Sequence, residues 1–99
     1  MSERVYVSGG MSGIPEEEYK ARFAQAERLL KERGMKVFNP CHWVWFLKYL
    51  PYKVALAFDL MMMCRCDRVY MLPDWTLSNG AVTEHTFACS TGMVIEYER

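Results

Sequence analysis

Net charge is the first thing that the sequence lacks, because 12 lysine and arginine residues balance 12 aspartate and glutamate residues. A neutral chain has none of the long-range field that draws proteins onto nucleic acids or anionic membranes. We therefore expect neither a nucleic-acid polymer nor a membrane among its partners. The composition favours a small molecule or another protein, and any anionic ligand must be held by local geometry.

The sequence also lacks an uninterrupted hydrophobic run long enough to span a membrane, which takes about 20 nearly uncharged residues. Its longest weakly polar stretch, residues 41–64, is broken by two lysines, a proline and an aspartate. The first residues have no apolar core of the kind that a signal peptide requires. We expect a cytoplasmic protein with reduced cysteines and no disulfide framework. The cysteines are Cys41, Cys64, Cys66 and Cys89.

Signatures of common nucleotide and metal enzymes are missing as well. The glycine-rich segment 8–13 does not read G-x-G-x-x-G, because position 8 is serine, and no Gly-Lys-Ser/Thr follows it. Cys64 and Cys66 do not have the ligand spacing of a zinc site. His85 and Cys89 share a helix face but have no third member for nucleophilic catalysis. We expect no metal and no cofactor.

What the sequence does contain is enough apolar residues, 52% of 99, for one globular domain over residues 1–99. Segments typical of strands alternate with segments typical of helices. This alternation predicts parallel β-α-β units in a small three-layer α/β/α fold, Rossmann-like or flavodoxin-like, with a mostly parallel four-stranded sheet. The expected strands are 5–8, 35–39, 68–72 and 93–97, and the expected helices are 15–34, 52–65 and 80–91.

Two segments between these elements have unusual compositions. Residues 41–50 are crowded with aromatic side chains, which suits either a short helix or an aromatic lid. The helix predicted at 52–65 is apolar nearly all round, so we expect it to be deeply buried or to face a partner copy. The second possibility predicts a homo-oligomer, a dimer or a larger assembly.

Three loops mark where a ligand should bind, because parallel sheets bind ligands at the carboxyl ends of their strands. These loops are 8–13, 39–42 and 73–80. Glycines in the first loop can bring backbone N–H groups close to a ligand, or they can simply make a tight turn. In the third loop Ser78 or Asn79 can cap the following helix, and Gly80 admits a ligand close to the backbone.

Two carboxylates stand out near these loops. Glu84 lies one helical turn beyond Gly80 and is expected either to look back into the cleft or to be a solvated first-turn residue. Its place beside a helix N-terminus favours the ionised form, which suits a nucleophile or a base. Asp59 interrupts an apolar helix and must find water, a cation, a hydrogen-bond donor or a ligand, so a functional role and a structural salt bridge both stay open. Asp67, just before a strand, is expected to act as a cap.

Four groups of residues occur in an order typical of one protein family. They are 5–15 (VYVSGGMSGIP), 37–40 (VFNP), Asp59 with Cys66 and Asp67, and 71–75 (MLPDW) followed by Ser78, Gly80, Ala81 and Glu84. Over nearly the whole chain this set resembles the DUF4406 domain. That family looks like a compact branch of the nucleoside 2-deoxyribosyltransferase superfamily, which also contains deoxynucleoside 5'-monophosphate N-glycosidases.

The resemblance implies an N-glycosidase or 2-deoxyribosyltransferase acting on a nucleoside or nucleotide. It implies that Glu84 attacks the anomeric carbon of the sugar and that Tyr6 orients this nucleophile. Asp59 and Asp74 are the implied partners of the leaving base. The residues implied to line the sugar or 5'-phosphate pocket are Ser8, Gly9, Gly10, Met11, Gly13, Ser78, Asn79 and Gly80.

The chemistry is coherent, because cleavage of an N-glycoside builds positive charge on the sugar ring, which a carboxylate can stabilise or trap. Two other functions stay open. One is a nucleotide or sugar-phosphate binding module that keeps the cleft without turnover. The other is a structural or host-interaction protein that works through its aromatic and methionine-rich surfaces.

Overall fold

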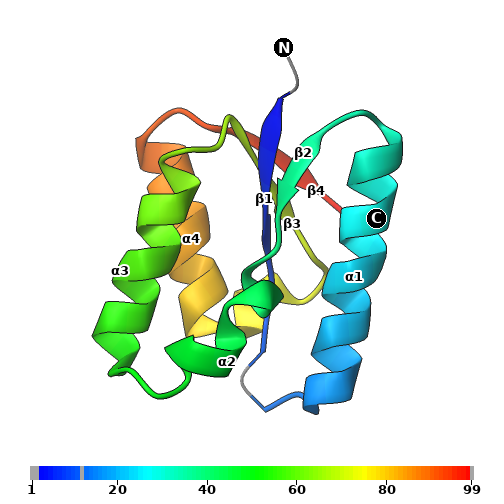
Figure 1. Ribbon diagram of the computed structural model, residues 1–99. Helices are drawn as coiled ribbons and strands as arrows, with labels where there is room; N and C mark the ends of the chain where they lie inside the picture. The colour runs from blue at the N-terminus through cyan, green and yellow to red at the C-terminus, as the bar shows by residue number, and fades with distance from the viewer. Residues whose placement is uncertain (1–2, 12, 99) are drawn as a thin grey trace.

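A four-stranded sheet with helices on both faces forms the centre of the computed structural model, which describes residues 3–11 and 13–98 (Figure 1). All three strand pairs are parallel, and the strand order is β2-β1-β3-β4. The predicted three-layer α/β/α fold is therefore confirmed, with a sheet that is wholly parallel over the described residues. The strands are β1 (Arg4–Ser8), β2 (Lys36–Phe38), β3 (Arg68–Met71) and β4 (Val94–Tyr97).

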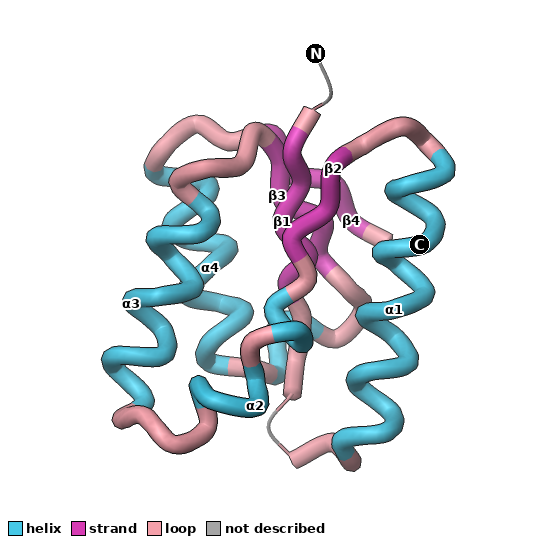
Figure 2. Tube along the Cα trace, viewed as in Figure 1, coloured by secondary structure: helices cyan, strands magenta, loops and turns pink. Residues whose placement is uncertain are grey.

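The helices divide between the two faces of this sheet (Figures 1 and 2). Helix α1 covers one face, and α3 and α4 cover the other. No helix among the described residues has the length and apolar character needed to cross a bilayer. The α-helices are α1 (Glu16–Glu32), α2 (Val44–Leu47), α3 (Tyr52–Met63) and α4 (Asn79–Ser90), and the 3-10 turns are η1 (Pro40–His42) and η2 (Trp75–Leu77).

Side-chain alternation along β1 separates two hydrophobic cores and prepares the site. Val5 and Val7 point to the α1 face, where the buried stripe of that helix covers them. Tyr6 points to the opposite face with Met63, Val69 and Met71. Ser8 follows Tyr6 on the same side, so β1 presents two hydroxyl groups to α4. The stripe of α1 consists of Tyr19, Phe23, Ala26 and Leu30.

Helix α1 begins and ends close to where the sequence predicts. Pro15 occupies the N-cap, and three glutamates follow in the first turn, where the helix dipole favours negative charge. Gly34 adopts a φ of 85° just beyond the C-terminus, a left-handed conformation that glycine tolerates. Local sequence signals therefore suffice to place this helix.

The aromatic segment 41–50 folds as the short helix α2 preceded by η1, which agrees with the helical alternative. The Asn39 side chain accepts a hydrogen bond from the Cys41 backbone N–H at 2.9 Å and so caps η1. Trp43 stacks on Phe38 with 6.0 Å between ring centroids, whereas Trp45 is 67% exposed. One side of this segment is therefore pinned to the protein, and the other faces outward.

Helix α3 is not deeply buried within the chain, contrary to one of the two expectations for it. Met63 alone among its described side chains is buried, and Met61 is 64% exposed. A helix that covers one face of a sheet turns only one side toward it, so the opposite side of α3 stays exposed. The partner copy expected to cover α3 stays a prediction. The four cysteines of the chain are all free thiols.

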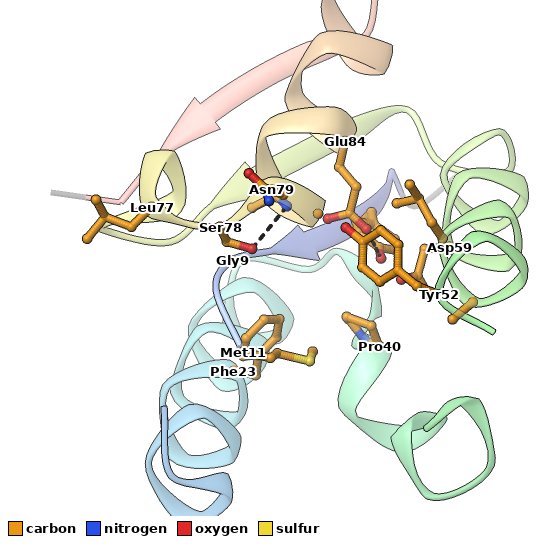
Figure 3. Close-up of a pocket in the computed structure, with 15 residues that line it drawn as sticks. Gly9, Met11, Phe23, Pro40, Tyr52, Asp59, Leu77, Ser78, Asn79 and Glu84 are labelled. Carbon is orange, nitrogen blue, oxygen red and sulfur yellow. Dashed lines mark hydrogen bonds between the residues drawn. The ribbon is translucent and has the colours of Figure 1, made fainter. Parts of the chain in front are cut away.

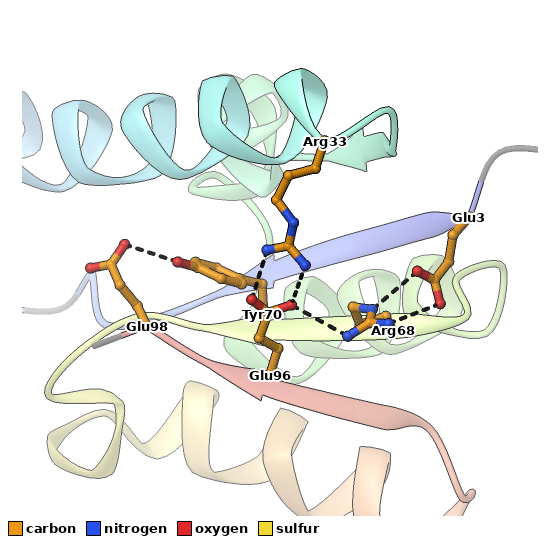
Figure 4. Close-up of polar contacts among 6 residues, drawn as sticks. All are labelled: Glu3, Arg33, Arg68, Tyr70, Glu96 and Glu98. Carbon is orange, nitrogen blue, oxygen red and sulfur yellow. Dashed lines mark hydrogen bonds and ion pairs between the residues drawn. The ribbon is translucent and has the colours of Figure 1, made fainter.

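Polar contacts at the amino-terminal side of the sheet tie β4 to the rest of the fold (Figure 4). The Arg33 guanidinium donates to both carboxylate oxygens of Glu96, at 2.7 and 3.0 Å. Arg68 bridges Glu96 and Glu3, and the Asp67 carboxylate accepts a hydrogen bond from the Arg4 backbone N–H at 3.1 Å. Asp67 therefore has the structural role expected of a cap.

The fold predicts a sharp difference in stability between substitutions at two apolar positions of α1, one buried and one exposed. Phe23→Ala should lower the free energy of unfolding by about 3–5 kcal/mol, because it empties a fully buried site. Leu29→Ala, at a side chain that is 43% exposed, should cost less than about 1 kcal/mol. Urea denaturation followed by circular dichroism measures both, and equal losses would contradict the placement of α1.

Candidate functional site

A cavity of about 300 Å³ opens at the carboxyl ends of β1 and β3, between α3 and α4 (Figure 3). This is the edge where parallel sheets bind ligands, next to the point where the chain order reverses between β1 and β3. Its lining combines carboxyl groups with glycine, serine and aromatic side chains. The lining residues are Tyr6, Gly9, Met11, Phe23, Pro40, Tyr52, Ala55, Leu56, Asp59, Leu77, Ser78, Asn79, Gly80, Ala81 and Glu84.

Glu84 lies at the bottom of this cavity, where two hydroxyl groups of β1 hold it. The Tyr6 hydroxyl donates to Oε2 at 2.8 Å, and the Ser8 hydroxyl donates to Oε1 at 2.6 Å. The side chain is only 6% exposed. Glu84 therefore looks back into the cleft, and the alternative of a solvated first-turn residue is wrong.

Burial changes the protonation of Glu84 from the ionised state that the sequence favours. Removal from water raises the pKa of this carboxyl to about 7, although the hydrogen bonds from Ser8 and Tyr6 act in the opposite direction. The negative charge of Asp59 contributes to the same rise, and the value of about 7 includes its effect. Burial also keeps the pKa of Tyr6 well above 10.0, so its phenol stays a hydrogen-bond donor.

Asp59 faces the same cavity from α3 and has no hydrogen-bond partner among the described residues. Its Oδ1 atom is buried without a hydrogen bond from any of the described residues. The structural salt bridge expected as one alternative is not found within residues 3–11 and 13–98, where no cation pairs with Asp59. Burial raises the pKa of this carboxyl to about 6. An unsatisfied buried oxygen is costly, so this atom requires water, a ligand or a proton from the cavity.

The loops at 8–13 and 73–80 supply only some of the lining residues that the resemblance implies. Gly9, Met11 and the turn 78–80 line the cavity, and the Ser78 hydroxyl caps α4 by accepting a hydrogen bond from the Ala81 N–H at 3.3 Å. Gly9 is required because a Cβ there would lie 2.9 Å from the Cβ of Leu72. The Ser8 side chain does not line the cavity; it contributes to the site through its hydrogen bond to Glu84.

Three expected positions lie outside the lining. Gly10 and Gly13 belong to the turn before α1, and Gly13 has a φ of 78°. Asp74 is exposed and adopts a left-handed conformation, φ 64°, just before η2. The structure therefore does not bring Asp74 together with Tyr6 and Glu84. Ser12, in the same glycine-rich loop, lies outside the described residues.

Tyr52 is the main residue of the site that the sequence interpretation missed. It starts α3, and its hydroxyl lies 3.3 Å from the position that a Cβ on Gly80 would take. Figure 3 shows Tyr52 on the same side of the cavity lining as Glu84 and Asp59. A signal was available, because Tyr52, Ala55, Leu56 and Asp59 follow the i, i+3, i+4, i+7 spacing of one helix face.

The arrangement places two carboxyl groups of different surroundings around one cavity. Glu84 receives two hydrogen bonds from hydroxyl groups, whereas Asp59 receives none from the part of the chain that the structure describes. No Lys or Arg side chain is among the described residues that line the cavity. The described residues also contain no group of three or more side chains suited to hold a metal ion. The chemistry available here is nucleophilic attack and proton transfer by carboxyl groups.

Comparison with known proteins gives one match. A family model described as "Domain of unknown function (DUF4406)" matches residues 3–97. No curated protein and no solved structure matches the chain.

The raised pKa of Glu84 predicts that the protein loses stability as the pH rises. The unfolded chain ionises this carboxyl near 4.5, whereas the folded protein keeps the proton until about pH 7. The folded state binds more protons in this interval, so the free energy of unfolding falls with rising pH. At about 1.4 kcal/mol per unit of pKa difference, the fall is on the order of a few kcal/mol. Urea denaturation at a series of pH values measures it.

Two variants control this experiment. Glu84→Gln should flatten the pH dependence without abolishing it, because the raised pKa of Asp59 gives a slope of the same sign. Glu17→Gln, at an exposed position of α1, should retain the wild-type slope. A Glu84→Gln protein that loses stability as steeply as the wild type would show that Glu84 is not protonated on folding.

Proposed function

The chain belongs to the DUF4406 family, and we propose that it cleaves the N-glycosidic bond of a deoxyribonucleoside or its 5'-monophosphate. The products would be a free base and either a hydrolysed sugar or a sugar transferred to a second base. One observation carries the proposal: the buried Glu84 carboxyl is held by Tyr6 and Ser8 at the bottom of a cavity that Asp59 also faces. The motif resemblance to the nucleoside 2-deoxyribosyltransferase superfamily supports the same chemistry.

In the first step a Glu84 oxygen forms a bond to the anomeric carbon while the bond from this carbon to the base nitrogen breaks. The electron pair of the broken bond stays on the base, and Asp59 donates a proton to it. In the second step water or another base attacks the anomeric carbon and releases the Glu84 carboxylate. The Asp59 carboxylate takes up the proton that the acceptor loses, which restores the starting state.

The hydrogen-bond pattern suits these opposite roles. The two carboxyl groups titrate as a coupled pair between about pH 6 and about pH 7. When the pair holds one proton, the higher pKa of Glu84 places that proton mainly on Glu84. The reaction uses the other arrangement, in which Asp59 holds the proton and the Tyr6 and Ser8 hydroxyls donate to the Glu84 anion. In this arrangement of the singly protonated pair, Glu84 is the nucleophile and Asp59 is the proton donor.

Tyr6 is a positioning residue in this mechanism, because its phenol orients one Glu84 oxygen and leaves the reacting face of the carboxyl to the cavity. Asp59 takes the role of assisting the leaving base. The resemblance also implies that role for Asp74, but the exposed position of Asp74 does not support it. The variant Asp74→Asn separates the two assignments.

The proposal predicts release of free base from at least one member of a panel of deoxynucleosides and their 5'-monophosphates. Chromatography of the reaction mixture measures the base, with a second base added to detect transfer. Glu84→Ala should reduce release to background, because it removes the attacking group. Asp74→Asn and Glu17→Gln should retain the wild-type rate.

Full activity in Glu84→Ala would refute the assignment of the nucleophile. Saturable binding of a deoxynucleotide without any base release would instead favour the binding module. Neither binding nor release across the panel would leave the structural or host-interaction role.

The coupled carboxyl pair predicts a bell-shaped dependence of kcat/KM on pH. Activity should rise as the first proton leaves the pair, fall as the second leaves, and reach its maximum between about pH 6 and about pH 7. Asp59→Asn should lower the rate by about 10²–10⁴-fold and remove the falling limb. A falling limb unchanged in Asp59→Asn would show that another group supplies the proton.

A further inference from the structure

A second cavity, of about 400 Å³, adjoins the first. The two share Met11, Pro40, Tyr52, Ala55 and Asp59 in their linings. The remaining wall of the second cavity comes from α1, from α2 and from the turn that follows α2. These residues are Tyr19, Val44, Leu47, Lys48 and Leu50.

The carboxyl groups distinguish the two cavities. The first is lined by both Glu84 and Asp59, whereas the second is lined by Asp59 and not by Glu84. A bond attacked by one carboxyl and protonated at its leaving side by the other must lie where both are present. The sugar therefore lies on the side of Glu84, and the leaving group extends past Asp59 into the second cavity.

We propose that this second cavity is the subsite of the leaving nucleobase and that α2 with Leu50 forms its specificity wall. The proposal rests on the proposed N-glycosidase function for the identity of its occupant. It gives the aromatic segment 41–50 a role that neither its composition nor the resemblance supplied.

The chemistry of the wall suits the faces of a planar heterocycle. Val44, Leu47 and Leu50 are apolar, as are the shared Met11 and Pro40. Pockets of this kind orient a ligand through shape and a few polar groups. The polar groups here are the hydroxyls of Tyr19 and Tyr52, the shared carboxyl of Asp59, and Lys48 as the one cation among the described lining residues.

Aromatic contacts hold this wall against the reacting site. Tyr6 stacks on Phe38 with 5.5 Å between ring centroids, and Phe38 stacks in turn on Trp43 at 6.0 Å. Trp43 and Phe46 both pack against Phe58 of α3, with 6.0 and 5.7 Å between ring centroids. The chain of rings therefore runs from the residue that positions Glu84 to the start of α2, and it fixes the distance between the two subsites.

The test compares two tryptophan substitutions. Val44→Trp fills the second cavity, whereas Val54→Trp places the same side chain on an exposed part of α3 that lines neither cavity. Calorimetry or ligand-observed NMR would measure the binding of adenine, guanine, cytosine and thymine, and separately of 2-deoxyribose 5-phosphate. Val44→Trp should weaken binding of the preferred base by about tenfold or more and leave the sugar phosphate unaffected. Val54→Trp should change neither.

Leu50→Ala provides a second variant if Val44→Trp does not fold, because it removes contacts without adding bulk. It should alter the ratio of kcat/KM values between purine and pyrimidine substrates without shifting the pH profile. No base bound by the wild type at millimolar concentration, or unchanged base binding in both cavity variants, would overturn the subsite. Equal weakening of base and sugar phosphate would overturn it as well.

The subsite and the proposed function can fail separately. Base release that is insensitive to Val44→Trp and Leu50→Ala would refute the subsite and leave the N-glycosidase standing. Base binding that Val44→Trp abolishes, in a protein without base release, would support the subsite and refute the catalytic proposal.

Discussion

The burial of one carboxyl group under two hydroxyl groups is the constraint on which the site depends. Tyr6 and Ser8 reach Glu84 because they alternate out of β1 on the side of α4. This places hydrogen-bond donors from the central part of the sheet against a side chain more than 70 residues later in the chain. The cost of burying the charged carboxylate appears as its raised pKa, and the hydrogen bonds from Tyr6 and Ser8 offset part of that cost. Under the proposed function, stability and reactivity are therefore linked through the same residue.

Much of the fold could be predicted because its signals are local. Pro15, the acidic first turn and Gly34 mark the ends of α1 without reference to any other part of the chain. The alternation of strands and helices is enough to predict the parallel sheet. The packing of α3 could not be predicted in this way, because its apolar composition says that it must be covered but not by what. Whether the Met61 side chain is exposed depends on how much of α3 the sheet can cover.

The candidate site was predictable in its residues and less so in its state. Glu84 and Asp59 are visible in the sequence as carboxyl groups in unusual places, and both line the cavity. The raised pKa of Glu84 was not predictable from its place near a helix N-terminus, since it depends on burial by distant segments. Asp74 shows the opposite limit: the motif places it beside the site, but in the folded chain it is exposed, has a left-handed φ of 64° and does not line the cavity. Tyr52 was missed because a tyrosine after a proline is also typical of an ordinary helix start.

Helix α2 lies outside the sheet and lines the second cavity, so this part of the cavity wall is separate from the strands that hold the fold together. Its four residues, Val44–Leu47, add no strand and lie on the excursion between β2 and α3. Insertions and substitutions in such connections are tolerated far better than changes in a core strand. Under the proposed subsite, substitutions in this excursion would change which base is accepted and leave the carboxyl pair and the strands beneath it intact. Substitution of Glu84 would instead disturb a group held against the central strand β1.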